Sequence, residues 1–131
     1  MTRNEYDHYE RQIRIFGRKG QERLKTAKVF VAGAGGLGAA ICTYLVQAGI
    51  GTLRIVDKGR VERSNLNRQF LFGEEDIGTV KVEAAAAAIS RMNPSVRVEA
   101  LRETITKKSV LDLVGDCAII VDAMDNYSAR H

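Results

Sequence analysis

The sequence predicts an α/β domain, a Rossmann-like parallel sheet in the order 3-2-1-4, preceded by an N-terminal helical arm. Two observations lead to this prediction. Short apolar runs alternate with helical segments along residues 28–123 in the order β-α-β-α-β-α-β, and right-handed crossovers turn this alternation into a parallel sheet. A glycine-rich turn at residues 33–38 follows the first run and opens the first helix, as in doubly wound folds.

Residues 1–27 form the predicted arm, and residues 28–131 form the predicted Rossmann-like domain. An apolar residue recurs every three or four positions, which is typical of a helix with one buried stripe. This stripe contains Tyr6, Tyr9, Ile13 and Phe16. Gly17 and Gly20 are expected to break the arm into two short helices.

Local patterns predict each element of the domain. Strands are expected at residues 28–32, 52–56, 96–101 and 117–123. Helices are expected at residues 36–48, 79–92 and 107–114. The polar segment at residues 58–78 is long for an irregular connection, and such loops are usually functional.

The last predicted strand, residues 117–123, is almost entirely apolar, which is typical of a strand buried on both faces. In the order 3-2-1-4 this strand is nevertheless an edge, and native proteins seldom leave such an edge open. The sheet is therefore expected to be half of a larger one, apparently truncated after its fourth strand, or to be covered by a partner. The end at His131 favours truncation.

Composition narrows the possible classes of protein. A chain of 131 residues holds one domain, and no apolar run is long enough for a signal peptide or a membrane span. Cys42 and Cys117 form no C-x-x-C pair, so we expect buried cysteines, no zinc site in this chain and a cytoplasmic location. The net charge of +4 comes from residues 1–28. No motif for nucleic acid accompanies this charge, so neither nucleic acid nor a membrane is expected as a partner.

The glycine turn predicts a nucleotide site, because a helix N-terminus presents backbone N–H groups to phosphate. Its glycines are Gly33, Gly35, Gly36 and Gly38. Asp57 ends the second strand, where a carboxylate can accept hydrogen bonds from ribose hydroxyls. These features serve a nicotinamide cofactor and ATP equally well.

A second polar cluster favours ATP. Residues 64–69 read Ser-Asn-Leu-Asn-Arg-Gln, and Lys81 opens the next helix. Cleavage of a triphosphate needs such positive charge around the phosphates, whereas hydride transfer does not. Plainer alternatives remain: Arg68 and Lys81 as solvated charges, Asp57 as a loop cap, and Asp122 bound to the backbone at the end of its strand.

These motifs, with Asp-x-x-Asp-Asn at residues 122–126 and Arg-Gln at residues 11–12, resemble the E1-like activating enzymes of the ThiF, MoeB and HesA group. The resemblance runs over essentially the whole chain. It implies ATP-dependent adenylation of the C-terminal glycine of a ubiquitin-like sulfur-carrier protein, of the ThiS/MoaD type with a Gly-Gly tail. It also implies sulfur transfer of the thiamine or molybdopterin type. The apolar edge strand and the arm that carries Arg11 both predict a second copy of the chain, and so a homodimer.

The same resemblance implies roles for single residues. Arg68, Lys81 and Asp125 would act on the phosphates, with Asp125 holding Mg²⁺, and Arg11 would reach the site of the partner subunit in trans. The implied ATP-binding set is Gly33, Gly35, Gly36, Gly38, Asp57, Ser64, Asn65, Arg68, Gln69, Lys81, Asp125 and Asn126.

Three interpretations stay open at this point: an E1-like adenylyltransferase fragment, an NAD-type dinucleotide-binding domain, and a non-catalytic fragment that dimerises or acts as a scaffold. Family members continue beyond this chain into a half with further strands and a cysteine on a crossover loop. Neither Cys42 nor Cys117 matches that cysteine, so thioester or persulfide chemistry is not expected here. Whether this part alone turns over ATP is left open by the sequence.

Overall fold

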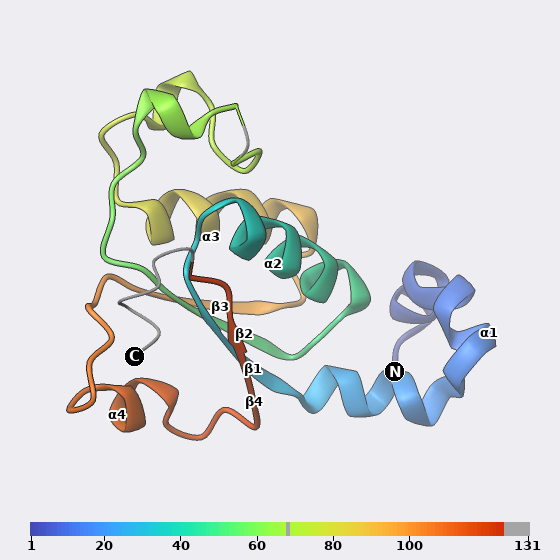
Figure 1. The fold of residues 1–131 in the computed structure, drawn as a ribbon. Coiled ribbons are helices and arrows are strands. Elements are labelled where there is room, and N and C mark those ends of the chain that lie inside the picture. The colour runs from blue at the N-terminus through green and yellow to red at the C-terminus, as the bar shows by residue number, and fades with distance from the viewer. Residues whose placement is uncertain (68, 125–131) are drawn as a thin grey trace.

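The computed structural model describes residues 1–67 and 69–124. It contains a four-stranded parallel sheet in the order β3-β2-β1-β4 (Figure 1), and the predicted fold class is confirmed. The strands are β1 (Lys28–Ala32), β2 (Thr52–Val56), β3 (Arg97–Leu101) and β4 (Ile119–Asp122). The helices are α1 (Arg3–Thr26), α2 (Gly36–Ala48), α3 (Lys81–Met92) and α4 (Val110–Val114), with 3-10 turns η1 (Arg63–Asn65) and η2 (Glu74–Asp76).

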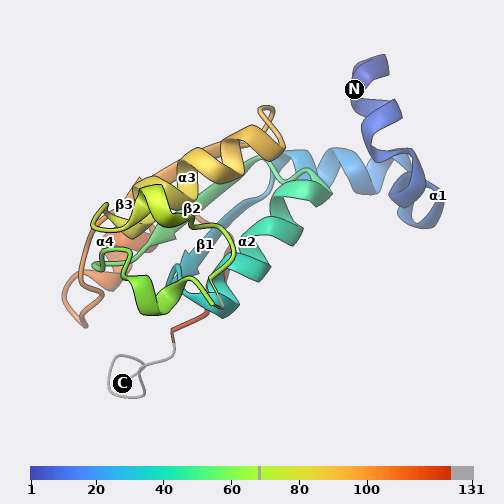
Figure 2. The ribbon, with the colours of Figure 1, turned by 90° about the horizontal axis from the view of Figure 1, so that it is seen from above.

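Helices lie on both faces of the sheet (Figures 1 and 2). Successive side chains of a strand point to opposite faces, so Val29 and Val31 join the larger core with α2 and α3. Phe30 and Ala32 point the other way, into a smaller cluster beside α4. None of the described helices is long and apolar enough to cross a membrane.

The arm is one helix with a kink at Gly17, whose φ of 74° is not helical. The predicted break at Gly17 is therefore confirmed, while the break at Gly20 is wrong because Gly20 lies inside the second limb. A Cβ on Gly20 would come within 2.8 Å of the Phe16 ring, so the missing side chain makes room for that ring. The predicted stripe is buried only at Tyr9 and Ile13.

The arm contacts the carboxyl end of α2. The side chains of Gln12 and Gln21 each donate a hydrogen bond to the Ala48 carbonyl, at 2.7 and 2.9 Å. The Asn93 side-chain amide donates a 2.7 Å hydrogen bond to the Tyr9 hydroxyl. These contacts fix the arm against α2 and against the end of α3.

Two helices begin later than the sequence predicts. The Val61 amide donates to the Thr79 carbonyl at 2.9 Å, so residues 79–80 pair with the loop and α3 begins at Lys81. Before α4, the Ser109 amide donates to the Thr106 hydroxyl at 3.1 Å. This closed turn replaces the first helical turn that was expected.

Strand β4 is an exposed edge within the part of the chain that the structure describes. Ile119 is 50% exposed and Ile120 is 60% exposed, and these neighbours point to opposite faces of the sheet. The expected burial on both faces is therefore not observed here. The physical reason is that β4 pairs with β1 on one side alone.

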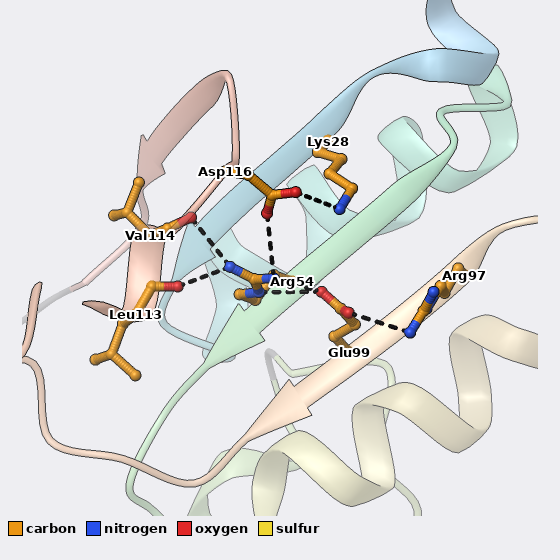
Figure 3. Close-up of polar contacts among 7 residues, drawn as sticks. All are labelled: Lys28, Arg54, Arg97, Glu99, Leu113, Val114 and Asp116. Carbon is orange, nitrogen blue, oxygen red and sulfur yellow. Dashed lines mark hydrogen bonds and ion pairs between the residues drawn. The ribbon is translucent and has the colours of Figure 1, made fainter. Parts of the chain in front are cut away.

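A charged cluster joins α4 to the sheet (Figure 3). Arg54 of β2 donates two hydrogen bonds to Glu99 Oε1, at 3.0 and 2.8 Å. Its Nη1 donates to the carbonyls of Leu113 and Val114, both at 3.0 Å. A single guanidinium therefore binds the last carbonyls of α4 and a carboxylate of β3.

Candidate functional site

The glycine turn is tightly folded between β1 and α2. Gly33 has a φ of 103°, and its amide donates to the Val56 carbonyl at 2.8 Å. A Cβ on Gly38 would overlap the Gly33 carbonyl oxygen. Gly35 is the N-cap of α2 and supplies no side-chain cap. Because the first N–H groups of a helix lack partners within it, this end of α2 is suited to binding an anion.

The end of β4 lies beside this turn. The Ala123 amide donates to the Ala32 carbonyl at 2.8 Å, and a Cβ on Gly33 would lie 3.0 Å from the Ala123 carbonyl oxygen. Asp122 Oδ1 accepts a 3.0 Å hydrogen bond from the Met124 amide. The strand order reverses between β1 and β4, and the glycine turn lies at this switch point, where open α/β sheets bind ligands. Asp122 makes the contact with the backbone that the sequence offered as its plainer alternative.

Asp57 follows β2 and binds two backbone amides. Its Oδ2 accepts from Ala34 at 2.9 Å, and its Oδ1 accepts from Gly59 at 2.7 Å. Asp57 therefore caps the loop, which the sequence offered as its plain alternative. Each carboxylate oxygen has two lone pairs, so both oxygens keep capacity for a ribose hydroxyl.

Residues 58–80 form a loop built around η1 and η2. Asn65 is 8% exposed, and its Oδ1 accepts a 2.8 Å hydrogen bond from the Glu62 amide. This capping role was not predicted, although Asn bonding to a backbone amide three residues away is a known local pattern. Ser64 is exposed, and Arg68 lies outside the described residues.

Gln69 brings this loop into contact with the glycine turn. It is 2% exposed, and its Nε2 lies 3.5 Å from the position that a Cβ on Gly35 would take. Leu71 and Phe72 belong to the larger core and hold the loop there. The motif placed Gln69 at the site, but no signal in the sequence indicated that it is buried.

Lys81 reaches the corner occupied by Asp57. It opens α3, and its amide donates to the Gly59 carbonyl at 3.0 Å. Both side chains lie against Gly59. A Cβ on Gly59 would be 3.0 Å from Asp57 Oδ1, and it would be 3.6 and 3.9 Å from Lys81 Cδ and Cε. The structure thus brings the predicted Lys81 and Asp57 together beside the turn.

Arg11 is not near the glycine turn of its own chain. It is exposed on α1, and α1 contacts the far end of α2 (Figure 1). Helix α2 has 13 residues, so these ends are roughly 20 Å apart at 1.5 Å per residue. Asp125 and Asn126 lie outside the described residues.

The two cysteines have no features of a nucleophile. Burial raises the pKa of the Cys42 thiol to about 12. Burial is also the largest cause of the raised pKa of Cys117. Both thiols are therefore protonated at neutral pH, whereas nucleophilic attack needs the thiolate. Within residues 1–67 and 69–124, no three His, Cys, Asp or Glu side chains are grouped to hold a metal ion.

Comparisons with known proteins agree with this geometry. Residues 9–131 match the ThiF family. The sulfur carrier protein adenylyltransferase of Thermus thermophilus is 44% identical over 99% of this chain and 49% of its own length. The SAMP-activating enzyme E1 of Haloferax volcanii is 43% identical over the whole chain and 49% of its own length. The chain therefore spans about half the length of these curated relatives.

The fold also matches solved structures. The E. coli tRNA N6-threonylcarbamoyladenosine dehydratase TcdA, solved in complex with ATP, superposes with a TM-score of 0.89 and 26% identity. That match covers 95% of this chain and 52% of TcdA. A structure of PaaA superposes with a TM-score of 0.87 and 38% identity, over 93% of this chain and 41% of PaaA.

Proposed function

Since this chain belongs to the ThiF family, we propose that it is the ATP-binding part of an E1-like adenylyltransferase. The acceptor is the C-terminal glycine of a ubiquitin-like sulfur-carrier protein of the ThiS/MoaD type, as in thiamine or molybdopterin sulfur transfer. One observation carries the proposal: the glycine turn, Asp57 and Lys81 meet at the carboxyl edge of the sheet, beside the switch point. The similarity to TcdA, which was solved in complex with ATP, supports the choice of nucleotide.

The residues of this edge have complementary roles toward ATP. The amino end of α2 donates backbone hydrogen bonds to the phosphates. Asp57 accepts hydrogen bonds from ribose hydroxyls. Lys81, with Ser64 and Arg68 of the loop, places positive charge and hydrogen-bond donors around the phosphates.

Magnesium fits the chemistry of this edge. The end of β4 and the end of β2 lie on either side of the glycine turn and carry Asp122 and Asp57. Mg²⁺ in nucleotide sites takes one or two carboxylates and completes its shell with phosphate oxygens and water. The family resemblance gives the carboxylate role to Asp125, next to Asn126, and an ion held there would neutralise phosphate charge.

The proposed reaction requires little acid–base catalysis from the protein. The carrier carboxylate is ionised at neutral pH and attacks the α-phosphorus of ATP. The bond from that phosphorus to the bridging oxygen breaks, and pyrophosphate leaves with the electron pair. The protein supplies position and charge compensation, which is what the turn and Lys81 offer. No general base is needed for this step.

The distant arm supports a homodimer in which Arg11 acts in trans. The arm's contacts with α2 lie at the carboxyl end of that helix, so Arg11 cannot serve the site of its own chain. A second copy supplies it, in the manner of an arginine finger.

Calorimetry tests nucleotide binding directly. The full chain is titrated with ATP and, separately, with NAD, and ATP is expected to bind. Lys81→Met is expected to weaken ATP binding by roughly tenfold or more, as expected for a hydrogen bond to a charged group. Lys108→Met removes an exposed lysine before α4 and should change nothing. Tight binding of NAD with no binding of ATP would show a dinucleotide domain instead.

Pyrophosphate exchange tests catalysis. Labelled pyrophosphate is incubated with the chain, ATP and a ubiquitin-like sulfur-carrier protein, and carrier-dependent incorporation into ATP is expected. If ATP binds but no exchange occurs, the chain is a binding module or scaffold rather than an adenylyltransferase.

A further inference from the structure

Gln69 carries a buried hydrogen-bond acceptor without a partner. Its side chain is almost fully buried at 2% exposure, and Oε1 has no hydrogen-bond partner among the residues that the structure describes. A buried acceptor of this kind is unfavourable. Native proteins pair the great majority of such atoms with protein, water or ligand.

The backbone holds Gln69 in this position from both sides. Its amide donates to the Asn65 carbonyl at 2.8 Å, and its carbonyl accepts from the Phe72 amide at 3.1 Å. The core residues Leu71 and Phe72 follow directly. The side-chain amide of Gln69, whose Nε2 lies 3.5 Å from the position of a Cβ on Gly35, is therefore held beside the glycine turn with Oε1 buried.

The chemistry of the missing partner follows from the atom. Oε1 is a hydrogen-bond acceptor, and the phosphate oxygens of ATP at neutral pH are also acceptors. Phosphate therefore cannot donate a hydrogen bond to Oε1. Its partner must offer an O–H or an N–H group. In a bound ATP, such donors are the ribose hydroxyls and the exocyclic amine of adenine.

Geometry favours the ribose. Asp57 Oδ2 accepts from the Ala34 amide, and Gln69 contacts the next residue, Gly35. The Asp57 carboxylate and the Gln69 side-chain amide, which come from the end of β2 and from the loop, thus lie beside two successive residues of one turn. In folds of this class the carboxylate at the end of β2 binds the ribose, so the neighbouring Gln69 amide is placed to meet the same sugar.

We propose that Gln69 Oε1 accepts a hydrogen bond from a ribose hydroxyl of the bound nucleotide, so that Gln69 selects ribonucleotides over deoxyribonucleotides. This inference rests on the proposed function, because it requires ATP at the glycine turn. It assigns Gln69 a contact with the sugar rather than with the phosphates.

The test is a cycle of protein and ligand variants, measured by calorimetry on the full chain. ATP, 2′-deoxy-ATP and 3′-deoxy-ATP are titrated into the wild type and into Gln69→Met, which keeps the shape but removes the acceptor. One deoxy analogue should bind the wild type roughly three- to tenfold more weakly than ATP, as expected for one hydrogen bond. In Gln69→Met the share of this penalty due to Gln69 should disappear. Any share due to Asp57 remains in both proteins, and the cycle separates the two.

Two further variants control for folding and for a generic effect. Gln47→Met changes an exposed glutamine of α2 and should keep every wild-type affinity ratio. Gln69→Glu retains an acceptor and should keep the deoxy penalty. Gln69→Leu removes the acceptor in a smaller apolar side chain and should lose the penalty, so the proposal stays testable even where Gln69→Met does not fold.

Three results would count against the proposal. Equal deoxy penalties in the wild type and Gln69→Met would show that Gln69 does not contact the sugar. So would loss of the penalty in Gln69→Glu. Purine riboside triphosphate is an ATP analogue that lacks the exocyclic amine of adenine. If Gln69→Met removes the loss of affinity for this analogue but not for the deoxy analogues, Oε1 binds adenine rather than the ribose. A wild type that does not bind ATP refutes the proposed function itself, which is a separate outcome.

Discussion

The start of α2 leaves no room for a side chain at Gly38, which makes Gly38→Ala a sharp perturbation. A Cβ there would overlap the Gly33 carbonyl oxygen and would lie 2.9 Å from the Gly33 carbonyl carbon. Both are backbone atoms, so no rotamer change relieves the clash. The Gly33 amide is itself bound to Val56 of β2, so moving Gly33 disturbs the sheet as well.

The size of the effect follows from this overlap. Restoring an ordinary carbon–oxygen contact requires the turn and α2 to separate by roughly 1 Å. Forced insertion of a methyl group into a packed interior costs about 1–3 kcal/mol, and we expect the upper part of this range because both sides are backbone. A 1 Å displacement of binding groups can reduce a rate or an affinity by roughly a hundredfold, so ATP binding should fall by about ten- to a hundredfold.

Gly35→Ala is the matched control for stability. Gly35 has a φ of −79°, which alanine adopts freely, and its added Cβ would lie at an ordinary 3.5 Å from Gln69 Nε2. Alanine is a poorer N-cap than glycine by about 1 kcal/mol, and its smaller unfolded-state entropy offsets about 0.4–1 kcal/mol of this cost. The free energy of unfolding, measured by urea titration with far-UV circular dichroism, should therefore stay within about 1 kcal/mol of the wild type. Calorimetry with ATP then shows whether a methyl group at the N-cap alone obstructs binding.

Either of two results would refute this reasoning. If Gly38→Ala unfolds at the wild-type urea concentration, the turn is not packed as closely as the structure indicates. If Gly38→Ala is destabilised yet binds ATP with wild-type affinity, the amino end of α2 is not where the phosphates bind.

Two further predictions concern the charged cluster and the arm. Arg54→Met leaves two α4 carbonyls and Glu99 without the guanidinium that donates to them, and it should lower the free energy of unfolding by about 2–4 kcal/mol. The control Arg97→Met removes a 76% exposed side chain that lies 3.6 Å from Glu99, and it should lower the free energy of unfolding by less than about 0.5 kcal/mol. Equal losses in the two variants would contradict the role of Arg54. Mixing the Arg11→Ala and Lys81→Met proteins should restore about a quarter of the wild-type pyrophosphate exchange. About half of randomly mixed dimers contain one copy of each variant, and one of the two sites in such a dimer has both Arg11 and Lys81 intact. No recovery of exchange, or a monomer in light scattering, would contradict action in trans.

The sequence predicts the sheet order well because its signals are local. The glycine turn, the apolar runs and the helical segments each depend on a few neighbouring residues. The rule of right-handed crossovers then leaves few ways to join them. The same locality explains why the sequence predicts Asp57 and Lys81 as site residues. Asp57 adjoins the end of a predicted strand, and Lys81 lies at the start of a predicted helix.

What the sequence misses depends on contacts between distant segments. The burial of Gln69 depends on how residues 58–80 fold back on the glycine turn, and no periodicity encodes that. The bond from Arg54 to Glu99 depends on strand register, which places these two residues directly opposite each other. Exposure of Ile119 and Ile120 likewise depends on what lies next to β4, whereas composition reports only that the strand is apolar.

The two ends of α2 bear on the proposed action of Arg11 in trans. At the carboxyl end, Gly49 has a φ of 87°, and a Cβ there would lie 2.5 Å from the Tyr9 ring. The arm therefore fits closely against this end and is held there by Gln21. The other end carries the glycine turn, a full helix length away. If Arg11 serves a glycine turn, as we propose, that turn belongs to another copy, because the length of α2 separates the arm's contacts from the turn of its own chain. Weakening the contact at Gly49 would thus lower catalysis in a dimer while leaving ATP binding by each chain intact.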